Sequence, residues 1–252
     1  MKGKTTAIVA GLTSIAMALA VCLESTGAAA LYFGVQKRSL PIYSVQTEEK
    51  KISISFDCAW GTEHTDAILK ALADEEVSAT WFMVEFWTER YPEYVKKIDE
   101  AGHEIGTHSR THSYMSRLSK EDIEDELKTS SEAITAITGK TVELFRPPYG
   151  DYDDLLVDTA KEMGVFSVQW DVDSLDWKDL SAGEIASRII SSAHPGAIIL
   201  CHNNGLHTAD ALPVILRTLK NKGYQFVPIG TLIYHSNFMI NSNGVQIPVE
   251  NT

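Results

Sequence analysis

Short apolar segments that resemble strands alternate with amphipathic helical segments along most of this 252-residue chain. Residues 51–56 alternate apolar and polar side chains as a strand does, and residues 65–74 repeat apolar side chains at helical spacing. Further strands are expected at 79–84, 104–107, near 144, 166–170, 197–200 and 225–228, and further helices at 91–101, 119–137, 154–163, 182–192 and 209–221. Strands that alternate with helices form parallel sheets, so we predict an α/β fold whose sheet is closed, or nearly closed, into a barrel.

Length and charge narrow the classes of protein that fit this pattern. A chain of 252 residues with 44% hydrophobic side chains can bury the core of one barrel-sized domain, so we expect a single domain. The formal net charge of −12 argues against nucleic-acid binding, because that function needs a basic surface. We expect a monomer with no nucleic-acid partner.

The first 30 residues look like a targeting segment rather than part of the fold. Lys2 and Lys4 precede the apolar residues 7–23, and small residues follow at 28–30. A cleaved signal peptide and a retained membrane anchor fit about equally well, and lipidation at Cys22 fits less well. We therefore expect an exported protein, secreted or anchored on the outer face of the cytoplasmic membrane, with this segment as its only contact with the membrane.

The remaining chain divides into three expected parts. Residues 31–48 form a strap or hairpin before the barrel, residues 49–234 form the barrel domain, and residues 235–252 form a polar tail. The chain has three cysteines, and only Cys58 and Cys201 lie in the barrel domain, which does not make a disulfide framework. Buried, unpaired cysteine is the expected state for both, with the Cys201 side chain facing the helices.

Short polar clusters follow the expected strands at the points where those strands end. They are Ser55-Phe56-Asp57-Cys58, His108-Ser109-Arg110-Thr111-His112, Arg146-Pro147-Pro148-Tyr149-Gly150, Asp173-Ser174-Leu175-Asp176-Trp177 and Leu200-Cys201-His202. In parallel barrels, residues at the carboxyl ends of the strands face the active site. Histidines, isolated aspartates and an arginine at these ends are the side chains that a metal-assisted hydrolase needs.

Two of these clusters suggest a metal and a base. Neutral imidazoles at the spacing of His108 and His112 can converge on one divalent cation, although two polar loop histidines that make hydrogen bonds would give the same pattern. Asp57 is the candidate base for the attacking water, and its alternative role is to cap the next helix.

The ordered clusters resemble those of the polysaccharide deacetylases, carbohydrate esterase family 4, over about residues 49–234. Within that family, the segments Leu40-Pro41-Ile42-Tyr43-Ser44-Val45 and Trp170-Asp171-Val172-Asp173-Ser174-Leu175-Asp176-Trp177 are most similar to the branch found in spore-forming Gram-positive bacteria. The resemblance implies a distorted (β/α) barrel that removes N-acetyl groups from amino sugars of a cell-wall or spore-wall glycan. It also implies a divalent metal, zinc first, with cobalt, manganese or nickel as alternatives.

The resemblance assigns catalytic roles around Asp57. Arg146 is similar to the family arginine that keeps the base ionised and aimed, and otherwise it would be a surface ion pair. The backbone N–H of Tyr149 is similar to a family donor of the oxyanion hole.

The last two clusters resemble the acid side of the reaction. His202 would protonate the leaving amine, and Asp176 would orient His202 and raise its pKa, with Asp173 as the alternative partner. The expected substrate contacts, each of which has ordinary core packing as its alternative, are Trp170, Leu200 and Trp177.

One position departs from the family pattern. The family motif usually has two adjacent aspartates, a base and then a metal ligand, whereas this chain has Asp57 followed by Cys58. Three interpretations stay open: Cys58 ligates as a thiolate, Glu63 or His64 replaces the missing carboxylate, or the two histidines hold the metal with water alone. We favour a non-ligating Cys58, because small apolar residues are typical of this position in the sporulation branch.

Two classes of function follow. The first is an exported, metal-dependent hydrolase acting on an N-acetylated glycan. The second is a carbohydrate-binding protein on a degenerate, metal-poor barrel, in which Cys58 marks the loss of the metal. A base, its arginine and an acid together favour the enzyme, and a hydrolase of small cyclic amides is a weaker third candidate.

Overall fold

The computed structural model describes residues 38–249, and its framework is a parallel sheet in the strand order β6-β5-β4-β3-β2-β8-β7. The strands are β2 (Lys51–Cys58), β3 (Thr80–Met83), β4 (Glu104–Thr107), β5 (Leu144–Phe145), β6 (Phe166–Ser167), β7 (Val172–Asp173) and β8 (Ile198–His202). A short strand, β9 (Gln225–Phe226), also pairs parallel with β2. The prediction of an α/β fold with a parallel sheet is confirmed.

The sheet curls into an incomplete barrel whose two edge strands are consecutive in the chain. After β6 on one edge, residues 168–171 cross directly to β7 on the other edge. The segment before the barrel fills part of this gap, because Ile42 bridges Val168 and its carbonyl accepts the Gln169 N–H at 2.7 Å. The barrel is therefore distorted by a break between β6 and β7. The segment around Ile42, which we call the strap, fills part of this break.

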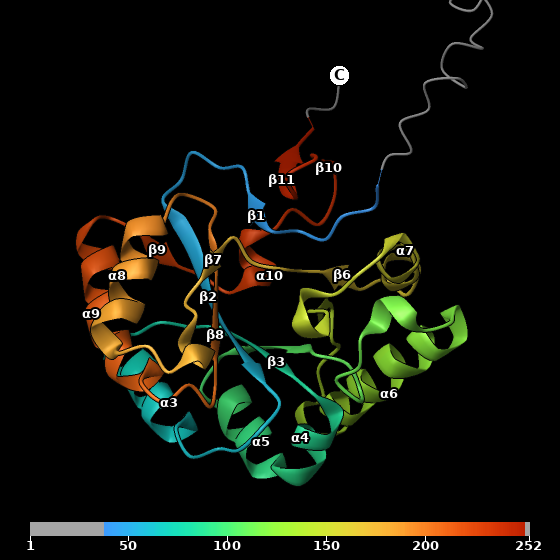
Figure 1. Ribbon diagram of the computed structural model, residues 1–252, viewed down its shortest axis with the longest axis horizontal. Helices are drawn as coiled ribbons and strands as arrows, with labels where there is room; N and C mark the ends of the chain where they lie inside the picture. Colours follow the sequence, from blue (N-terminus) through green and yellow to red (C-terminus); the bar gives the residue numbers. More distant parts are fainter. Residues whose placement is uncertain (1–37, 250–252) are drawn as a thin grey trace, which may run out of the picture. The chain divides into compact units, whose positions relative to one another are not determined.

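Helices surround the strands on the outside (Figure 1). They are α3 (Thr65–Asp74), α4 (Glu85–Arg90), α5 (Pro92–Glu100), α6 (Lys120–Thr138), α7 (Asp154–Glu162), α8 (Ala182–Ser192), α9 (Thr208–Asn221) and α10 (Ile229–Leu232). The expected boundaries of α3 and α8 agree with the structure, whereas α4 and α10 were not predicted. Both are short, at six and four residues, so neither carries enough helical periodicity to be read from sequence.

Cap residues explain where the long helix α6 begins and ends. The Ser119 hydroxyl accepts the Asp122 N–H at 3.2 Å, and Gly139 adopts a left-handed conformation with φ 71° just after the last turn. The start and end predicted from these two residues are confirmed.

Strand β2 has two different buried faces. Ile54 and Phe56 belong to the large apolar cluster beneath the helices. The alternate residues point into the barrel, where the Ser53 and Ser55 hydroxyls donate to the carbonyl oxygens of Val227 and Ile199 at 2.7 Å. Because successive side chains alternate between faces, the next inward residue after Ser55 is Asp57. The strand thereby directs a carboxylate into the carboxyl end of the barrel.

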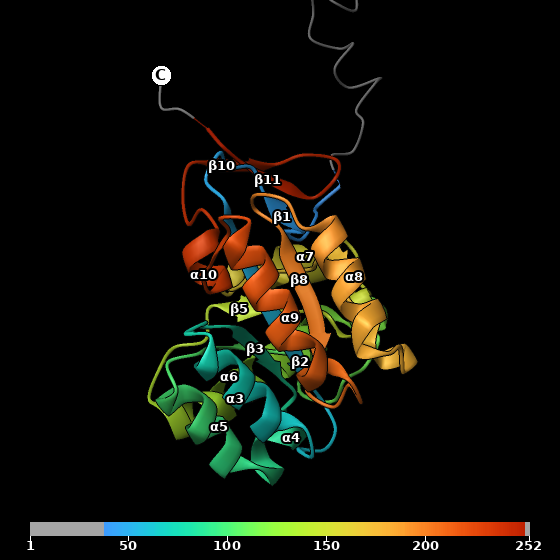
Figure 2. The same cartoon turned by 90° about the vertical axis from the view of Figure 1, so that its left-hand side faces the viewer.

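The chain after Tyr234 is not a simple polar tail, which corrects the sequence expectation. Strands β10 (Phe238–Ile240) and β11 (Val245–Pro248) form an antiparallel hairpin, and β11 pairs parallel with β1 (Ser44–Val45) of the strap. This three-stranded sheet lies at the end of the barrel where β2 begins (Figure 2). The pairing joins residues 44 and 245, so local sequence cannot reveal it.

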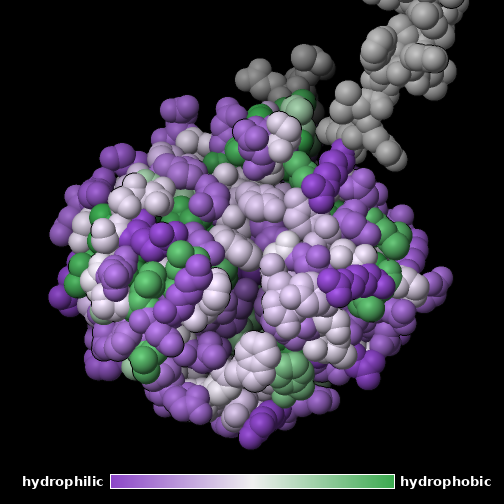
Figure 3. Space-filling model, in the orientation of Figure 1, coloured by the Kyte–Doolittle hydropathy of each residue, from purple (hydrophilic) through white to green (hydrophobic). Residues whose placement is uncertain are grey.

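The face of the protein drawn in Figure 3 is mostly hydrophilic. In Figure 3, hydrophobic residues are scattered among hydrophilic ones and do not merge into one broad patch. None of the helices within residues 38–249 is long and apolar enough to cross a membrane. The expected targeting segment, residues 1–30, lies outside the described residues.

A close backbone approach at Gly196 gives a test of how the strap is held. Gly196 has φ +81°, and an added Cβ would lie 1.7 Å from the Val45 carbonyl oxygen. We expect Gly196→Ala to lower the free energy of unfolding by about 2–4 kcal/mol, from left-handed strain and the clash combined. Urea unfolding measures the change. Gly183→Ala in α8 is the control, because its added Cβ meets nothing within 4 Å. An equal effect of the two substitutions would contradict this account.

Candidate active site

The carboxyl ends of β2, β4, β5 and β8 bring four of the predicted polar residues together. Asp57 pairs in register with His202 across β2 and β8. His108 follows β4, and Arg146 follows β5 on the neighbouring strand. The His108 Nε2 lies 3.5 Å from Asp57 Oδ2, and Arg146 Nη1 donates to Asp57 Oδ1 at 2.8 Å. Side chains that are up to 145 residues apart in sequence therefore surround one carboxylate.

Arg146 and Asp57 form a buried ion pair. Arg146 is fully buried, donates from Nη2 to the Gln169 carbonyl at 3.1 Å, and stacks its guanidinium 4.1 Å from the centroid of the Phe82 ring. Burial raises the pKa of Asp57, but the charge and hydrogen bond of Arg146, with a smaller attraction to His202, hold this pKa below its usual value. The Asp57 carboxylate is therefore ionised and fixed in direction.

His108 presents a nitrogen lone pair to Asp57. Its Nδ1 lies 2.7 Å from the Arg146 carbonyl oxygen, which can only accept, so Nδ1 carries the proton of the neutral ring. Burial lowers the pKa of His108, which favours that neutral ring. The Nε2 lone pair and the Asp57 carboxylate then face each other as two acceptors.

His112 adds a second neutral imidazole. Its ring centroid lies 5.0 Å from that of His108. Burial, followed by repulsion from His108, lowers the pKa of His112 to about 4. Its Nδ1 is buried and has no hydrogen-bond partner among the described residues. The two neutral imidazoles lie beside the Asp57 carboxylate, and no hydrogen-bond donor separates His108 Nε2 from that carboxylate. Such a concentration of lone pairs suits a cation.

The third position of a metal site is missing from this group. Within residues 38–249, no set of three His, Cys, Asp or Glu side chains is arranged to hold a metal ion. Neither Glu63 nor His64 completes such a set among the described residues: the Glu63 carboxylate lies against Gly61, and His64 is the N-cap residue of α3. The donors therefore fit a cation bound by two histidines, with its other ligands from outside the protein.

Cys58 faces away from the barrel interior. Strand β2 continues through Cys58, and the side chain belongs to the apolar cluster beneath the helices. Its sulfur lies 3.9 Å from the Phe56 carbonyl oxygen. Burial, followed by the negative charge of Asp57, raises the pKa of the Cys58 thiol well above its usual value. A neutral thiol in an apolar cluster supports the interpretation that Cys58 is packed rather than ligating.

His202 and Asp176 form the second polar pair of the site. Asp176 is buried, and His202 contacts it twice: Nδ1 lies 2.7 Å from Oδ1, and the backbone N–H donates to Oδ2 at 2.8 Å. Burial lowers the pKa of His202, but the hydrogen bond and charge of Asp176 outweigh burial and raise this pKa above its usual value. The alternative partner, Asp173, instead accepts the Leu175 N–H at 2.8 Å.

Two residues that support Asp176 were not predicted. The Thr208 hydroxyl donates to Asp176 Oδ2 at 2.7 Å. A Cβ at Gly205 would lie 2.7 Å from the same oxygen and 2.1 Å from the Thr208 hydroxyl, so only glycine leaves room for this contact. A glycine shortly after His202 was the one available sequence signal.

Tyr149 has a strained backbone next to the imidazoles. Its φ is 61°, which is unusual for a bulky residue and is found where the surroundings impose it, often at active sites. The Tyr149 ring is 56% exposed and packs against His112, with centroids 4.6 Å apart, and against Tyr114, with centroids 4.4 Å apart. The role of its N–H in an oxyanion hole stays a prediction.

The predicted substrate-contact residues differ in exposure. Leu200 is buried, Trp170 is half-buried with its ring 5.8 Å from the Arg146 guanidinium, and Trp177 is 57% exposed. Their roles stay predictions. The sequence did not predict Trp60, which is 56% exposed and lies against His112 with ring centroids 4.9 Å apart.

Comparisons with known proteins agree on one family. A family model described as polysaccharide deacetylase matches residues 44–168. A peptidoglycan-N-acetylglucosamine deacetylase of Bacillus cereus is 31% identical over 77% of this chain and 72% of its own length. The peptidoglycan-N-acetylmuramic acid deacetylase PdaA of Bacillus subtilis is 32% identical over 79% of this chain and 78% of its own length.

Two other similarities limit what can be transferred. The uncharacterized protein YlxY of Bacillus subtilis is 33% identical over 73% of this chain, and this chain spans only 57% of its length. The crystal structure of BA3943, a CE4 family pseudoenzyme from Bacillus anthracis, matches with 34% identity and a TM-score of 0.74 over 77% of this chain and 69% of that one. A mutant of BA3943 with restored enzymatic activity matches equally well over 71% of that chain.

The position of Cys58 gives a test of metal ligation. We expect Cys58→Ala to leave zinc affinity unchanged within about 2-fold, because the thiol is neutral and packed. Cys58→Asp should tighten zinc binding, since an unpaired carboxylate is unstable in the apolar cluster and favours turning toward the imidazoles. Zinc titration into the metal-free chain measures both. Cys201→Ala, at a second buried cysteine of the same cluster, is the control. A large affinity loss in Cys58→Ala alone would show that the thiolate is a ligand.

Proposed function

This chain belongs to the polysaccharide deacetylase family, and we propose that it is a metal-dependent hydrolase that removes N-acetyl groups from amino sugars of a cell-wall glycan. Relatives named as peptidoglycan deacetylases support peptidoglycan, or a spore-wall form of it, as the substrate. The catalytic domain would span residues 49–234. We further propose that the protein acts as a monomer outside the cytoplasmic membrane, either secreted or anchored by residues 1–30.

The observation that carries this proposal is a pair of groups on adjacent strands whose pKa values are shifted in opposite directions. Asp57 has a lowered pKa and His202 has a raised one, and the two residues pair in register on β2 and β8. Groups whose surroundings push their pKa values apart are suited to act as base and acid at one pH. Amide hydrolysis needs both, because the attacking water loses a proton and the leaving amine gains one.

The residues divide the reaction between them. Asp57 takes the proton from the attacking water, while Arg146 keeps this carboxylate ionised and aimed. The backbone N–H of Tyr149 donates to the oxygen of the tetrahedral intermediate. His202 gives the proton on its Nε2 to the leaving amine, because its Nδ1 is directed at Asp176. The C–N bond then breaks, and acetate and the free amino sugar are released.

His108 and His112 would hold the metal. A divalent cation, zinc first and cobalt, manganese or nickel next, supplies Lewis acidity to the site when it is bound. The His108 tautomer is set by the Arg146 carbonyl, as is usual for histidines that ligate metals. The packed Cys58 leaves the site with fewer protein ligands than the family motif, so the affinity for metal is expected to be low.

Exposed aromatic rings beside the imidazoles favour a glycan substrate. Trp60 and Tyr149 both contact His112, and Tyr114 stacks on Tyr149. Trp177 lies exposed on the loop that carries Asp176. Aromatic faces bind the apolar faces of sugar rings, so these residues would flank the reacting acetamido group. Leu200 and Trp170 would wall the pocket for its methyl group.

A second function is a carbohydrate-binding protein on a metal-poor barrel. The position of Cys58 and the similarity to a CE4 family pseudoenzyme favour it. Against it, both buried polar pairs of the base and the acid are intact in this chain. A protein that only binds sugar does not need either pair.

Acetate release from peptidoglycan and from chitooligosaccharide distinguishes the two functions. We expect the full chain to release acetate when zinc is supplied and Asp57→Asn to lose activity by about 10²–10⁴-fold with its metal content unchanged. Acetate is measured enzymatically and bound zinc by elemental analysis. Glycan binding without acetate release from the wild type, at any metal concentration, would leave the binding protein as the function.

The two pKa shifts predict a bell-shaped pH dependence of kcat/KM. Activity is lost as pH falls through the lowered pKa of Asp57, which protonates the base, and as pH rises through the raised pKa of His202, which deprotonates the acid. Asp176→Asn removes the charge that raises the His202 pKa, so we expect the alkaline limb to move to lower pH. The control is Asp171→Asn, which removes a carboxylate that contacts a different histidine. Asp171 Oδ2 lies 2.5 Å from His194 Nε2, and Asp171 Oδ1 accepts the Ile198 N–H at the start of β8. A shift of the alkaline limb in both variants would contradict the assignment.

A further inference from the structure

The segment that separates the two imidazoles has an unfavourable backbone conformation. Ser109 and His112 both lie in the left-handed region, with φ 75° and φ 57°. Non-glycine residues adopt this region only where other contacts over-determine it. One such contact comes from within the segment 109–111, because the Ser109 hydroxyl accepts the His112 N–H, and the others come from outside it.

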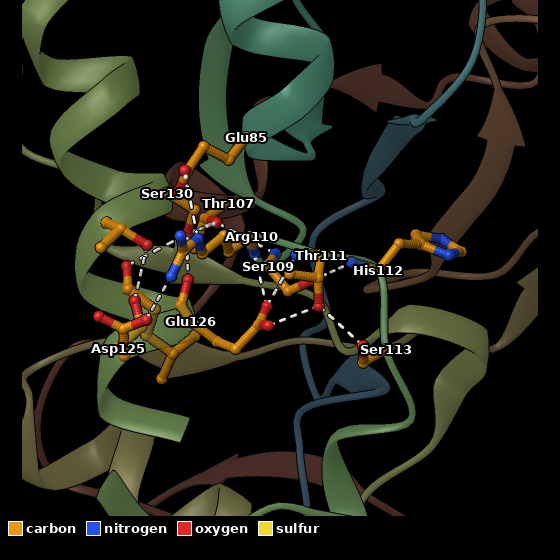
Figure 4. A network of polar contacts seen from close by, with 12 residues as sticks. Glu85, Thr107, Ser109, Arg110, Thr111, His112, Ser113, Asp125, Glu126 and Ser130 are labelled. Carbon is orange, nitrogen blue, oxygen red and sulfur yellow. Dashed lines mark hydrogen bonds and ion pairs between the residues drawn. The ribbon is translucent and has the colours of Figure 1, made fainter. Parts of the chain in front are cut away.

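A single carboxylate on α6 supplies most of these contacts (Figure 4). Glu126 Oε2 accepts the backbone N–H of Arg110 at 2.8 Å and of Thr111 at 2.9 Å. Glu126 Oε1 accepts the Thr111 hydroxyl at 2.5 Å. The side chain is only 7% exposed although it lies in the middle of a helix. Two of the three peptide N–H groups between His108 and His112, those of Arg110 and Thr111, are therefore bound to Glu126.

No cation among the described residues forms a salt bridge with Glu126. The neighbouring Arg110 guanidinium instead donates to Asp125 at 2.6 Å and lies 3.5 Å from Glu85. The negative charge of Glu126 is thus stabilised by backbone N–H groups, as an anion is in a nest of successive amides.

Further polar contacts lie beside Glu126 and reach the backbone of His112. The Ser109 hydroxyl accepts the His112 N–H at 3.0 Å, and the Ser109 N–H donates to the Thr107 hydroxyl at 3.2 Å. The Thr107 hydroxyl lies 2.6 Å from that of Ser130, one turn after Glu126 on α6. In Figure 4 the His112 ring projects away from this network. The polar contacts therefore fix the His112 backbone and do not occupy its ring nitrogens.

We infer that Glu126 is a positioning residue that sets the geometry of the imidazole pair through the segment 109–111. It contacts neither substrate nor metal. By binding two consecutive amides it holds His112 in its strained conformation beside His108. With only two protein ligands available, metal affinity depends on how well their relative position is fixed before the cation binds. This inference rests on the proposed metal-dependent function.

The test uses the full chain with four single substitutions. Glu126→Leu removes every acceptor. Glu126→Gln keeps one oxygen for the amides and places an NH₂ group against the Thr111 hydroxyl, which can turn to accept. Glu132→Leu removes an exposed carboxylate of the same helix, which lies 4.0 Å from Lys128 Nζ. His112→Ala provides the baseline for a chain with one imidazole lost.

Zinc affinity is measured by competition with a chromophoric chelator. We expect a loss of about 10–100-fold in Glu126→Leu, at most about 3-fold in Glu126→Gln, and no change in Glu132→Leu. Long-range proton–nitrogen spectra of the metal-free chain follow the imidazoles directly. The His112 ring signals should shift or broaden in Glu126→Leu, while those of His202 stay in place. A role in stability alone would lower the urea midpoint without moving either readout.

The outcomes separate this inference from the proposed function. Wild-type zinc binding without acetate release would contradict the function and leave the role of Glu126 intact. Zinc affinity and His112 ring signals in Glu126→Leu that match those in Glu132→Leu would overturn the role of Glu126. If the wild type binds no zinc, the ring signals alone test the role of Glu126. Shifted His112 signals in Glu126→Leu would support that role, and signals like those of Glu132→Leu would overturn it.

Discussion

The rest of the site depends on one buried residue, Arg146, which acts through both its side chain and its backbone. Its guanidinium binds Asp57 at 2.8 Å, and its carbonyl oxygen lies 2.7 Å from His108 Nδ1. The side chain therefore fixes the ionised carboxylate, and the backbone fixes the tautomer of the imidazole that faces it. Removing one partner of such a buried pair costs on the order of 3–5 kcal/mol, because the other charge is left without compensation. The direction of the base and that of the first imidazole cannot be changed independently.

The pair of Asp176 and His202 uses the same physical principle with the charges exchanged. In the first pair a buried cation lowers the pKa of a carboxylate, and in the second a buried carboxylate raises the pKa of an imidazole. Each buried charge has several donors or acceptors: Asp176 is contacted by the ring and N–H of His202 and by Thr208. Because β2 and β8 are neighbours, the two pairs lie side by side, and the charge of Asp57 also raises the pKa of His202.

The parts of the fold that sequence predicted are those set by local patterns. Helix α6 begins at Ser119 and ends before Gly139 because these residues satisfy its terminal groups. The position of Asp57 at the carboxyl end of the first expected strand also predicted that it faces the site. The tail hairpin was not predictable, since β11 pairs with β1 about 200 residues away. Glu126 was missed for a similar reason. It lies in a run of acidic residues that resembles a solvated helix face, and its partners are backbone N–H groups that no sequence pattern marks.

Cys58 shows how a change at one position alters the site without disturbing its neighbours. Strand β2 includes Cys58, and the thiol adds a buried side chain to the cluster beneath the helices. A carboxylate at the same place would have to leave that cluster, because an unpaired buried charge is costly. The chain therefore gains packing where the family motif has a ligand. The buried pairs of Asp57 with Arg146 and of Asp176 with His202 have not been replaced by apolar side chains. Such a replacement is often neutral or stabilising for a buried ion pair. Stability alone therefore gives little reason to keep them, whereas a proton acceptor and a proton donor on adjacent strands give a chemical one.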